Sequence, residues 1–170
     1  MANTKIPNEL LEIGAKAFGT SSIMIGDSTT GTINAANYNT GVGVDVFAAL
    51  TTGDDNTVMG FGAGDAITTG DANTFIGTYS GSATTTSDSN TGVGRSNLNQ
   101  NTTGASNTGL GADCLASNTT GSYNVAVGHR ALDSNTTASN NTAVGTDALK
   151  SNTTGDVNVA VGSLALDANT

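Results

Sequence analysis

This sequence of 170 residues contains one cysteine, one histidine and one proline, and it has no tryptophan. A single cysteine, Cys114, excludes an intrachain disulfide bond. The histidine, His129, has no second histidine or cysteine at the spacing of metal ligands, so we interpret it as a solvated loop residue. These shortages give no support to a cofactor, a metal centre or a catalytic site. We therefore expect no enzyme activity and no bound cofactor.

Charged and strongly apolar residues are also scarce. Charged residues make up 11% of the chain, and only 32 of its 170 residues are leucine, isoleucine, valine or phenylalanine. A net charge of −9 offers no basic patch for phosphates, so we do not expect nucleic acid as a partner. No apolar run is long enough to cross a bilayer, and the first residues lack the basic and apolar regions of a secretory signal peptide. We therefore expect neither membrane insertion nor a signal peptide.

Gly, Ala, Ser, Thr and Asn dominate the rest of the chain, a composition shared by flexible linkers and by repetitive β structure. A fixed period distinguishes the two. Asparagine recurs with a constant 17-residue period from Asn39, an apolar residue stands three positions after it, and glycine follows directly. These glycines are Gly43, Gly60, Gly77, Gly94, Gly111, Gly128, Gly145 and Gly162. Such a period predicts a solenoid.

The 17-residue unit predicts one coil of an all-β solenoid, or β-roll, because it is too short for a long helix and a strand. We count positions from the recurring asparagine. Alternation along Asn141-Thr-Ala-Val-Gly places positions two and four on one face, which we expect to point inward as Thr142 and Val144. Val127, Val161, Leu132, Leu149 and Leu166 are the corresponding apolar anchors of other units. Glycine would turn the corner, and Asn124, Asn141 and Asn158 would stack as a hydrogen-bonded ladder.

Position three is never charged and would then face outward. It is occupied by Gly41, Val58, Phe75, Gly92, Gly109, Ala126, Ala143 and Ala160. Because one coil buries few large side chains, a lone column would be marginally stable. We therefore expect a homo-oligomer that packs through this column.

The sequence divides into residues 1–21, a docking or capping segment, and residues 22–170, the repeat. The units start at 22 (degenerate), 39, 56, 73, 90, 107, 124, 141 and 158, and the last is incomplete. Residues 7–19 have the start, apolar side and glycine stop of a short helix. A competing local interpretation makes residues 147–151 a helical turn, which would not change the solenoid.

Few residues are candidates for chemistry. Cys114 and Ser80 share position eight with alanines, so a small buried residue is the natural interpretation. Asp54, Asp71 and Asp88 share position sixteen and would lie about 5 Å apart in successive coils. We interpret them as a solvated edge, with divalent-cation binding as the weaker alternative. The four Asn-Thr-Thr sequons are a product of the repeat, so they do not indicate glycosylation.

Asn124-Val-Ala-Val-Gly128 and Asn158-Val-Ala-Val-Gly162 resemble the Asn-Ser-Val-Ala-Ile-Gly repeats of trimeric autotransporter adhesin heads. That resemblance implies a left-handed parallel β-roll with three chains around one axis. The fuller unit at Asn141 to Asp156 resembles repeats of phage tail fibres, and Ala2 to Leu11 is similar to the start of marine phage tail-fibre proteins. The adhesin repeat is shorter than the unit of this chain, so the cross-section differs.

These resemblances favour a structural fibre segment of a phage tail, in the virion, that contacts itself and, through its N-terminus, other tail proteins. A bacterial surface adhesin head is the alternative. An ice-binding solenoid is a remote one, because such proteins space their threonines by two so that both face outward. Thr153 and Thr154 are adjacent and would face opposite sides. Phe61, Phe75 and Tyr79 replace small or polar residues of later coils. They could stack on host glycans, or they could fill the core or an interface.

Overall fold

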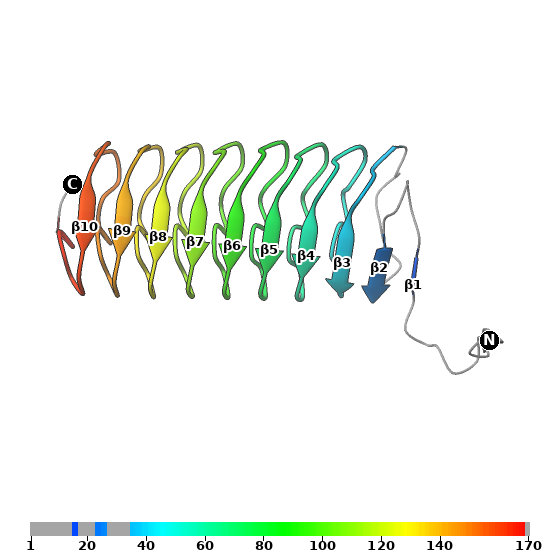
Figure 1. The fold of residues 1–170 in the computed structure, drawn as a ribbon, viewed down its shortest axis with the longest axis horizontal. Helices are drawn as coiled ribbons and strands as arrows, with labels where there is room; N and C mark the ends of the chain where they lie inside the picture. The colour runs from blue at the N-terminus through cyan, green and yellow to red at the C-terminus, as the bar shows by residue number, and fades with distance from the viewer. Residues whose placement is uncertain (1–14, 17–22, 27–34, 169–170) are drawn as a thin grey trace, which may run out of the picture.

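The protein forms one ten-stranded sheet wound into a β-solenoid. The computed structural model describes residues 15–16, 23–26 and 35–168. The coils stack into a straight rod with one short strand per coil (Figure 1). The strands are β1 (Ala15–Lys16), β2 (Ile23–Gly26), β3 (Thr40–Gly43), β4 (Thr57–Met59), β5 (Thr74–Ile76), β6 (Thr91–Val93), β7 (Thr108–Leu110), β8 (Val125–Val127), β9 (Thr142–Val144) and β10 (Val159–Val161). The all-β solenoid of 17-residue coils is confirmed, and no helix occurs among the described residues.

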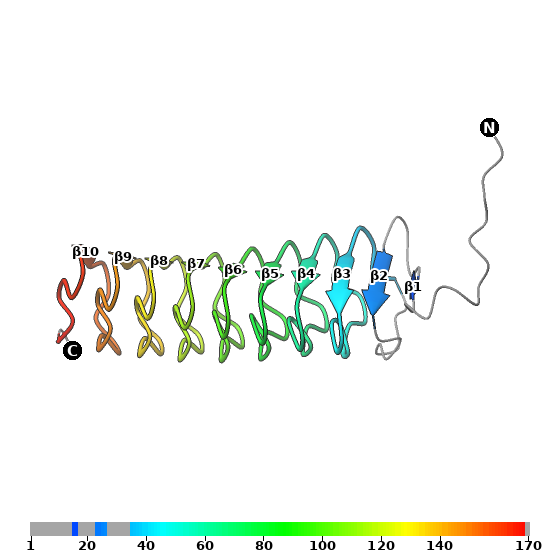
Figure 2. The same cartoon turned by 90° about the horizontal axis from the view of Figure 1, so that it is seen from below.

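Neighbouring strands from β2 to β10 pair in parallel, always with an offset of one repeat unit. Thr142 pairs with Val159, and Val144 pairs with Val161. The degenerate first unit keeps the same offset, since Ile23 pairs with Thr40 and Gly26 with Gly43. Figure 2 shows the strands along one side of the rod and the turn segments along the opposite side. The repeat period therefore determines the register of the parallel strands.

The two faces of the strand are the reverse of our expectation. Position three is buried, as in Val58, Phe75 and Ala143, whereas Val125 at position two and Met59 at position four are 36% and 47% exposed. The cause lies at position one, where the asparagine side chain is buried in every coil from Asn39 to Asn141. Positions one and three share a face by alternation, so position three follows the asparagine inward. The expected contact between chains through position three is therefore excluded.

The buried asparagines form a ladder along the axis, as the sequence predicts. In each step the side-chain oxygen of one asparagine accepts hydrogen bonds from the next. Asn107 Oδ1 accepts from the main-chain N–H of Asn124 at 3.0 Å and from its Nδ2 at 3.1 Å. The same Nδ2 also donates to the carbonyl of Ala138 at 2.9 Å. These hydrogen bonds compensate for the burial of the amides. Asn141 is an exception within the ladder, because its Nδ2 is buried without a hydrogen-bond partner.

A second asparagine ladder runs along position twelve in the later coils. Asn118 donates to Asn101 at 2.8 Å, and Asn135 donates to Asn118 at the same distance. Earlier coils fill this column with the buried apolar side chains of Leu50 and Ile67. The asparagines of this column occupy consecutive coils, because each buried amide is satisfied in part by the amide of the neighbouring coil.

The apolar core is narrow, and large side chains fit where a nearby residue is glycine. Leu98, Leu115, Leu132 and Leu149 are fully buried at position nine, as expected. In the early coils the ring of Phe75 occupies the space beside Gly81 and Gly92, where an added Cβ would lie 2.5 and 3.0 Å from the ring. Leu166, the equivalent leucine of the last described coil, is 51% exposed.

The corner glycines have the geometry that the sequence predicts. Gly128 and Gly145 have φ values of +121° and +133°, outside the range that most side chains adopt. A Cβ on Gly145 would lie 2.5 Å from the carbonyl oxygen of Gly162 in the next coil. Asp147 and Leu149, with φ of +59° and +50°, are left-handed, so the alternative helical turn over 147–151 does not form.

At the N-terminal end of the stack, β1 pairs antiparallel with β2, with Ala15 opposite Ile25 and Lys16 opposite Met24. This pairing covers the edge of β2 that faces away from the repeat, which a solenoid end requires. The expected helix over 7–19 is therefore wrong at residues 15–16, and the rest of it lies outside the described residues. No helix in the described part of the chain could cross a membrane.

Candidate functional site

Two aromatic side chains project from the corner that follows β4 and β5. The rings of Phe61 and Tyr79 lie 5.3 Å apart at 78°, an edge-to-face pair. They come from adjacent coils, which are joined here by a hydrogen bond of 2.9 Å from the main-chain N–H of Tyr79 to the carbonyl of Phe61. Gly62 lies against the ring of Tyr79 and has no side chain to displace it. Both rings keep close to half of their surface exposed, at 45% for Phe61 and 43% for Tyr79.

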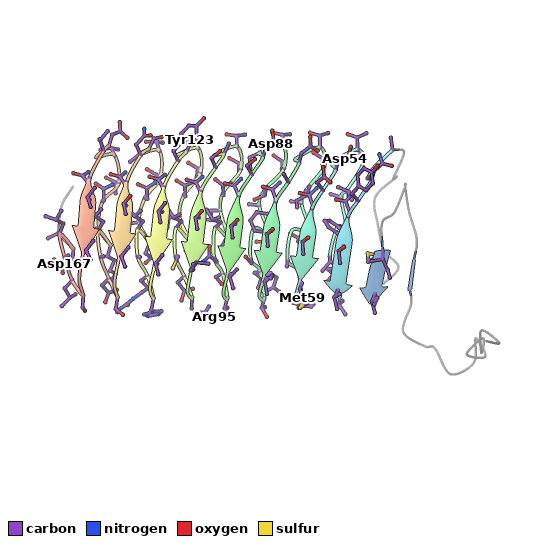
Figure 3. The ribbon with its side chains drawn as sticks, viewed as in Figure 1. Asp54, Met59, Asp88, Arg95, Tyr123 and Asp167 are labelled. Carbon is purple, nitrogen blue, oxygen red and sulfur yellow. The ribbon has the colours of Figure 1, made fainter. Side chains whose placement is uncertain are left out.

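The corner pair lies within a wider apolar patch. Val44 and Met59 are each 47% exposed and belong to the same end of the strands. Figure 3 shows Met59 at one edge of the rod, opposite the edge that carries Asp54 and Asp88. Phe75, the third aromatic candidate, is fully buried in the core. It is therefore excluded as a glycan contact, because position three faces inward.

The acidic column at position sixteen binds the protein's own main chain. The carboxylate of Asp54 accepts from the N–H of Asn37 at 2.6 Å, Asp71 from that of Asp54 at 2.7 Å, and Asp88 from that of Asp71 at 2.8 Å. Each aspartate thus caps the N–H of the coil before it. No group of three potential metal ligands occurs among the described residues. These hydrogen bonds explain why aspartate recurs at position sixteen. Cation binding by these aspartates stays a prediction.

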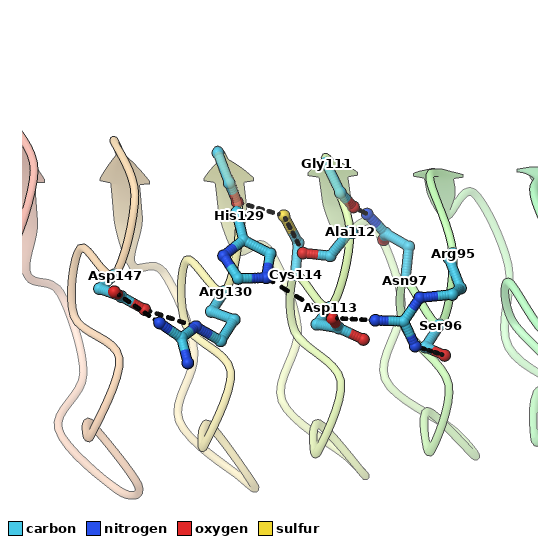
Figure 4. Close-up of polar contacts among 11 residues, drawn as sticks. Arg95, Ser96, Asn97, Gly111, Ala112, Asp113, Cys114, His129, Arg130 and Asp147 are labelled. Atoms are coloured by element: carbon cyan, nitrogen blue, oxygen red, sulfur yellow. Dashed lines mark hydrogen bonds and ion pairs between the residues drawn. The ribbon is translucent and has the colours of Figure 1, made fainter.

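A row of charged side chains follows the corners of the later coils (Figure 4). Arg95 forms an ion pair of 2.5 Å with Asp113, and His129 lies 3.7 Å from the same carboxylate. Arg130 forms an ion pair of 2.8 Å with Asp147 of the next coil. Arg95 and His129 are largely exposed, so these pairs contribute little to stability. The contact of His129 with a solvated ion pair agrees with its interpretation as a surface residue.

Cys114 and Ser80 are both fully buried at position eight, as the column of small residues predicts. Cys114 Sγ donates to the carbonyl of Gly128 at 2.7 Å, and Ser80 Oγ donates to that of Gly92 at 3.0 Å. Burial raises the pKa of the Cys114 thiol to about 11, because the thiolate would lose its hydration. A thiol that stays protonated and inaccessible is a packing residue, not a nucleophile.

The asparagines of the four Asn-Thr-Thr sequons cannot receive a glycan in the folded chain. Asn101, Asn118, Asn135 and Asn152 are fully buried in the second ladder. Their neighbours at position thirteen donate across the stack, as Thr102 does to the carbonyl of Thr119 at 3.0 Å. The second threonine of the sequon is exposed, as Thr103 and Thr120 show. The sequons are therefore parts of two structural ladders.

The outer face of the sheet is the largest feature that the sequence did not reveal. Positions two and four project from it, and we call these two columns the outer strip. Position two contributes Thr40, Thr57, Thr74, Thr91, Thr108, Val125, Thr142 and Val159, and position four contributes Val42, Met59, Ile76, Val93, Leu110, Val127, Val144 and Val161. The strip has no charged residue along eight coils. Its strict column pattern was visible in the sequence, but the burial of the asparagines decides that it faces solvent.

Comparison with protein-family models, with curated proteins and with solved structures found no match. The function of the chain must therefore be inferred from its own surface. Two features of that surface are candidates: the Phe61–Tyr79 pair and the outer strip.

Proposed function

We propose that this chain is a structural fibre segment, and specifically a segment of a phage tail fibre that holds a receptor-binding part away from the particle. The observation that carries the proposal is the constancy of the cross-section. The same strand, ladder and corner recur at every level from β3 to β10. A rod of this kind gains length with each added unit and repeats the same outer strip at each level.

The rod is also well suited to transmit force along its axis. Each coil is joined to the next by parallel strand hydrogen bonds, by the main asparagine ladder and by the threonine bonds of position thirteen. These bonds run along the axis, so a pull on one coil is shared by many bonds at once. The resemblance of the repeats to those of tail fibres and adhesin heads supports the same conclusion. A bacterial surface adhesin head is the alternative with the same mechanics.

The experiment that tests the proposal is immuno-electron microscopy of phage particles from cells that carry the gene. Antibodies raised against the purified 170-residue chain should label the tail fibres. The same antibodies applied to uninfected cells provide the control. Labelling of the cell surface in the absence of phage would replace the tail-fibre proposal with the adhesin alternative, and labelling of neither would reject both.

The aromatic pair supports a second role, contact with glycans on the host surface. An exposed ring can stack on the apolar face of a sugar, and Phe61 and Tyr79 offer two ring surfaces at one corner. Glycan-array binding by the purified chain should fall at least tenfold in Phe61→Ala and Tyr79→Ala variants. Tyr123→Ala is the matched control, since Tyr123 is 64% exposed and lies at the opposite edge from Met59 (Figure 3). Equal binding by all variants would exclude the pair.

A further inference from the structure

The aromatic pair of Phe61 and Tyr79 lies in a part of the rod that carries only negative charge. From residue 35 to residue 94 the sequence has no lysine, arginine or histidine, and Arg95 is the first cationic side chain after this stretch. The same stretch contains six aspartates: Asp45, Asp54, Asp55, Asp65, Asp71 and Asp88. Such a field attracts a positively charged ligand to the rings and repels an acidic one.

The first of these aspartates lies one coil from the surface that the Tyr79 ring covers. The ring lies against Gly62, where an added Cβ would be 2.7 Å from Cε1. The main-chain N–H of Gly62 donates to the carbonyl of Val44 at 3.0 Å, so Gly62 is joined to the preceding coil. Asp45 follows Val44 and shares position seven with Gly62. Adjacent strands are about 4.8 Å apart, so the carboxylate of Asp45 belongs to the level next to the ring.

Asp65 adds a second carboxylate beside Asp45. It occupies position ten, and a later coil shows where this position lies: Asn99 Nδ2 donates at 3.2 Å to the carbonyl of Tyr79, which is at position seven of the preceding coil. Asp65 has the same relationship to Asp45. Burial raises the pKa of the Asp65 carboxyl, and the charge of Asp45 raises it further. Within the described part of the chain neither carboxylate forms an ion pair, so both charges are available to a ligand.

The two rings offer the surface to which an organic cation binds. The face of an aromatic ring is the negative part of its quadrupole and attracts a cation. The planes of Phe61 and Tyr79 meet at 78°, so the rings form two walls of an open corner, and both are close to half exposed. Val44 and Met59, each 47% exposed, extend the apolar surface around them.

The type of cation follows from the same surface. A primary ammonium group is strongly hydrated and needs hydrogen-bond acceptors for its three N–H donors. A quaternary ammonium group has no N–H donor and presents methyl groups, so it needs apolar contact and nearby negative charge. The corner supplies apolar and aromatic contact first and carboxylates at its margin, which matches the second type.

We infer that the corner of Phe61 and Tyr79 binds a quaternary ammonium group of the choline class, with Asp45 and Asp65 supplying the opposite charge. This inference rests on the proposed contact with host glycans and deepens it, because the group would be a substituent of such a glycan. The rings would contact the methyl groups of the cation. The carboxylates would act through their charge.

The first test is an NMR titration of the purified chain, with isotope-labelled phenylalanine and tyrosine, by choline chloride. We expect the ring signals of Phe61 and Tyr79 to shift and to saturate in the millimolar range, because both rings stay partly open to water. The ring of Tyr123, 64% exposed at the opposite edge from Met59, is the internal control and should not shift (Figure 3). The neutral isostere of choline, in which a tert-butyl group replaces the trimethylammonium group, should bind at least about threefold more weakly.

Matched variants separate ring, charge and general field. Phe61→Leu keeps an apolar side chain without a ring face and should raise the dissociation constant of choline about threefold or more. Asp65→Asn keeps the shape without the charge and should raise it about threefold. Asp55→Asn removes the same charge from an exposed residue beside Asp54, at the opposite edge, and should change it less than about 1.5-fold. Circular dichroism establishes that each variant is folded.

The source of the group is tested with two carriers. Phosphocholine coupled to dextran should retain the wild-type chain and release it when free choline is added. Vesicles of phosphatidylcholine present the same group on a lipid surface. Retention by the vesicles and not by the dextran would overturn the assignment to a glycan.

Absence of ring shifts in the wild-type chain would overturn the inference without any variant, and so would equal binding of choline and its neutral isostere. Equal effects of Asp55→Asn and Asp65→Asn would also overturn it, because a general field would then explain the binding. Neutral sugars that bind to the rings of a chain that does not bind choline would reject the cation and leave the glycan contact standing. Antibody labelling of phage particles is independent of all these results, so the ligand class and the tail-fibre function can fail separately.

Discussion

The main-chain N–H of Asp71 donates a hydrogen bond of 2.8 Å to the carboxylate of Asp88, one coil further along the axis. The same relationship joins Ala105 to Ser122 and Ser139 to Asp156, at 3.0 and 2.6 Å. Position sixteen is therefore a capping column, in which a side-chain oxygen accepts a hydrogen bond from the main-chain N–H of the preceding coil. What looks in the sequence like a stripe of repelling acids is a set of main-chain caps.

Ala105 interrupts this column, because its methyl group cannot accept a hydrogen bond from the N–H of Asp88. Ala105→Ser should restore the missing cap and raise the free energy of unfolding by about 0.5–1 kcal/mol. Chemical denaturation monitored by circular dichroism measures the change. Ala112→Ser, a substitution at a half-buried corner outside the column, should leave stability within about 0.5 kcal/mol of the wild type. Equal effects of the two serines would contradict the capping role.

Gly145 is a corner at which any side chain meets two obstacles. Its φ of +133° is unfavourable for L-residues, and a Cβ would lie 2.5 Å from the carbonyl oxygen of Gly162. Gly145→Val should lower the free energy of unfolding by more than about 2 kcal/mol. Ser163→Val, at an exposed position directly after the corner glycine of the last coil, should be tolerated. Thermal unfolding compares the two, and equal melting temperatures would mean that the glycines are not required at the corners.

Val157 is a β-branched residue in the left-handed region, with a φ of +60°. Asn140 occupies the same position in the preceding coil with a φ of +61°, and asparagine tolerates this conformation better than valine. Val157→Asn should therefore stabilise the chain by about 1 kcal/mol. Val159→Asn replaces a similarly exposed valine in the extended conformation of β10 and should not stabilise it. Differential scanning calorimetry of both variants would detect the difference. A loss of stability in Val157→Asn would show that the left-handed conformation of Val157 is not strained.

Asp65 makes stability depend on pH. Burial raises the pKa of its carboxyl, and the charge of Asp45 adds to the rise. Its Oδ1 is buried without a hydrogen-bond partner. Because the folded-state pKa lies above the unfolded value, the folded chain binds the proton more tightly. The contribution of Asp65 is therefore most favourable in acid and is lost as pH rises through the raised pKa.

Asp65→Asn removes the unfavourable free energy of holding a charged carboxylate in a partly buried site. Asn99, at the same position of a later coil, donates from Nδ2 to the carbonyl of Tyr79, so an amide fits this column. The variant should unfold at a higher temperature than the wild type at pH 7, and the difference should shrink below the ordinary aspartate pKa of about 3.9. A pH-independent difference between the two melting temperatures would show that the carboxyl of Asp65 is not the cause.

The period, the register and the corners could be predicted from the sequence alone. Asparagine and glycine recur once in each unit without insertion, so each coil must meet the next at equivalent residues. The stacked asparagines and the buried leucines of position nine could be predicted as well. These features follow from local chemistry: glycine permits the corner, and identical amides can pair along a stack.

Tertiary structure decided which face of the strand is the inside. Alternation separates Thr142 and Val144 from Ala143, but it does not say which set is buried. Apolarity favours burying Val144, whereas the structure buries Asn141, whose side-chain oxygen accepts hydrogen bonds from the main-chain N–H and the Nδ2 of Asn158 in the next coil. Ala143 follows Asn141 inward, and Val144 is left on the surface. Which face is buried depends on contacts between equivalent residues of successive coils. The pattern of a single coil does not contain these contacts, so it could not indicate that the outer strip faces solvent.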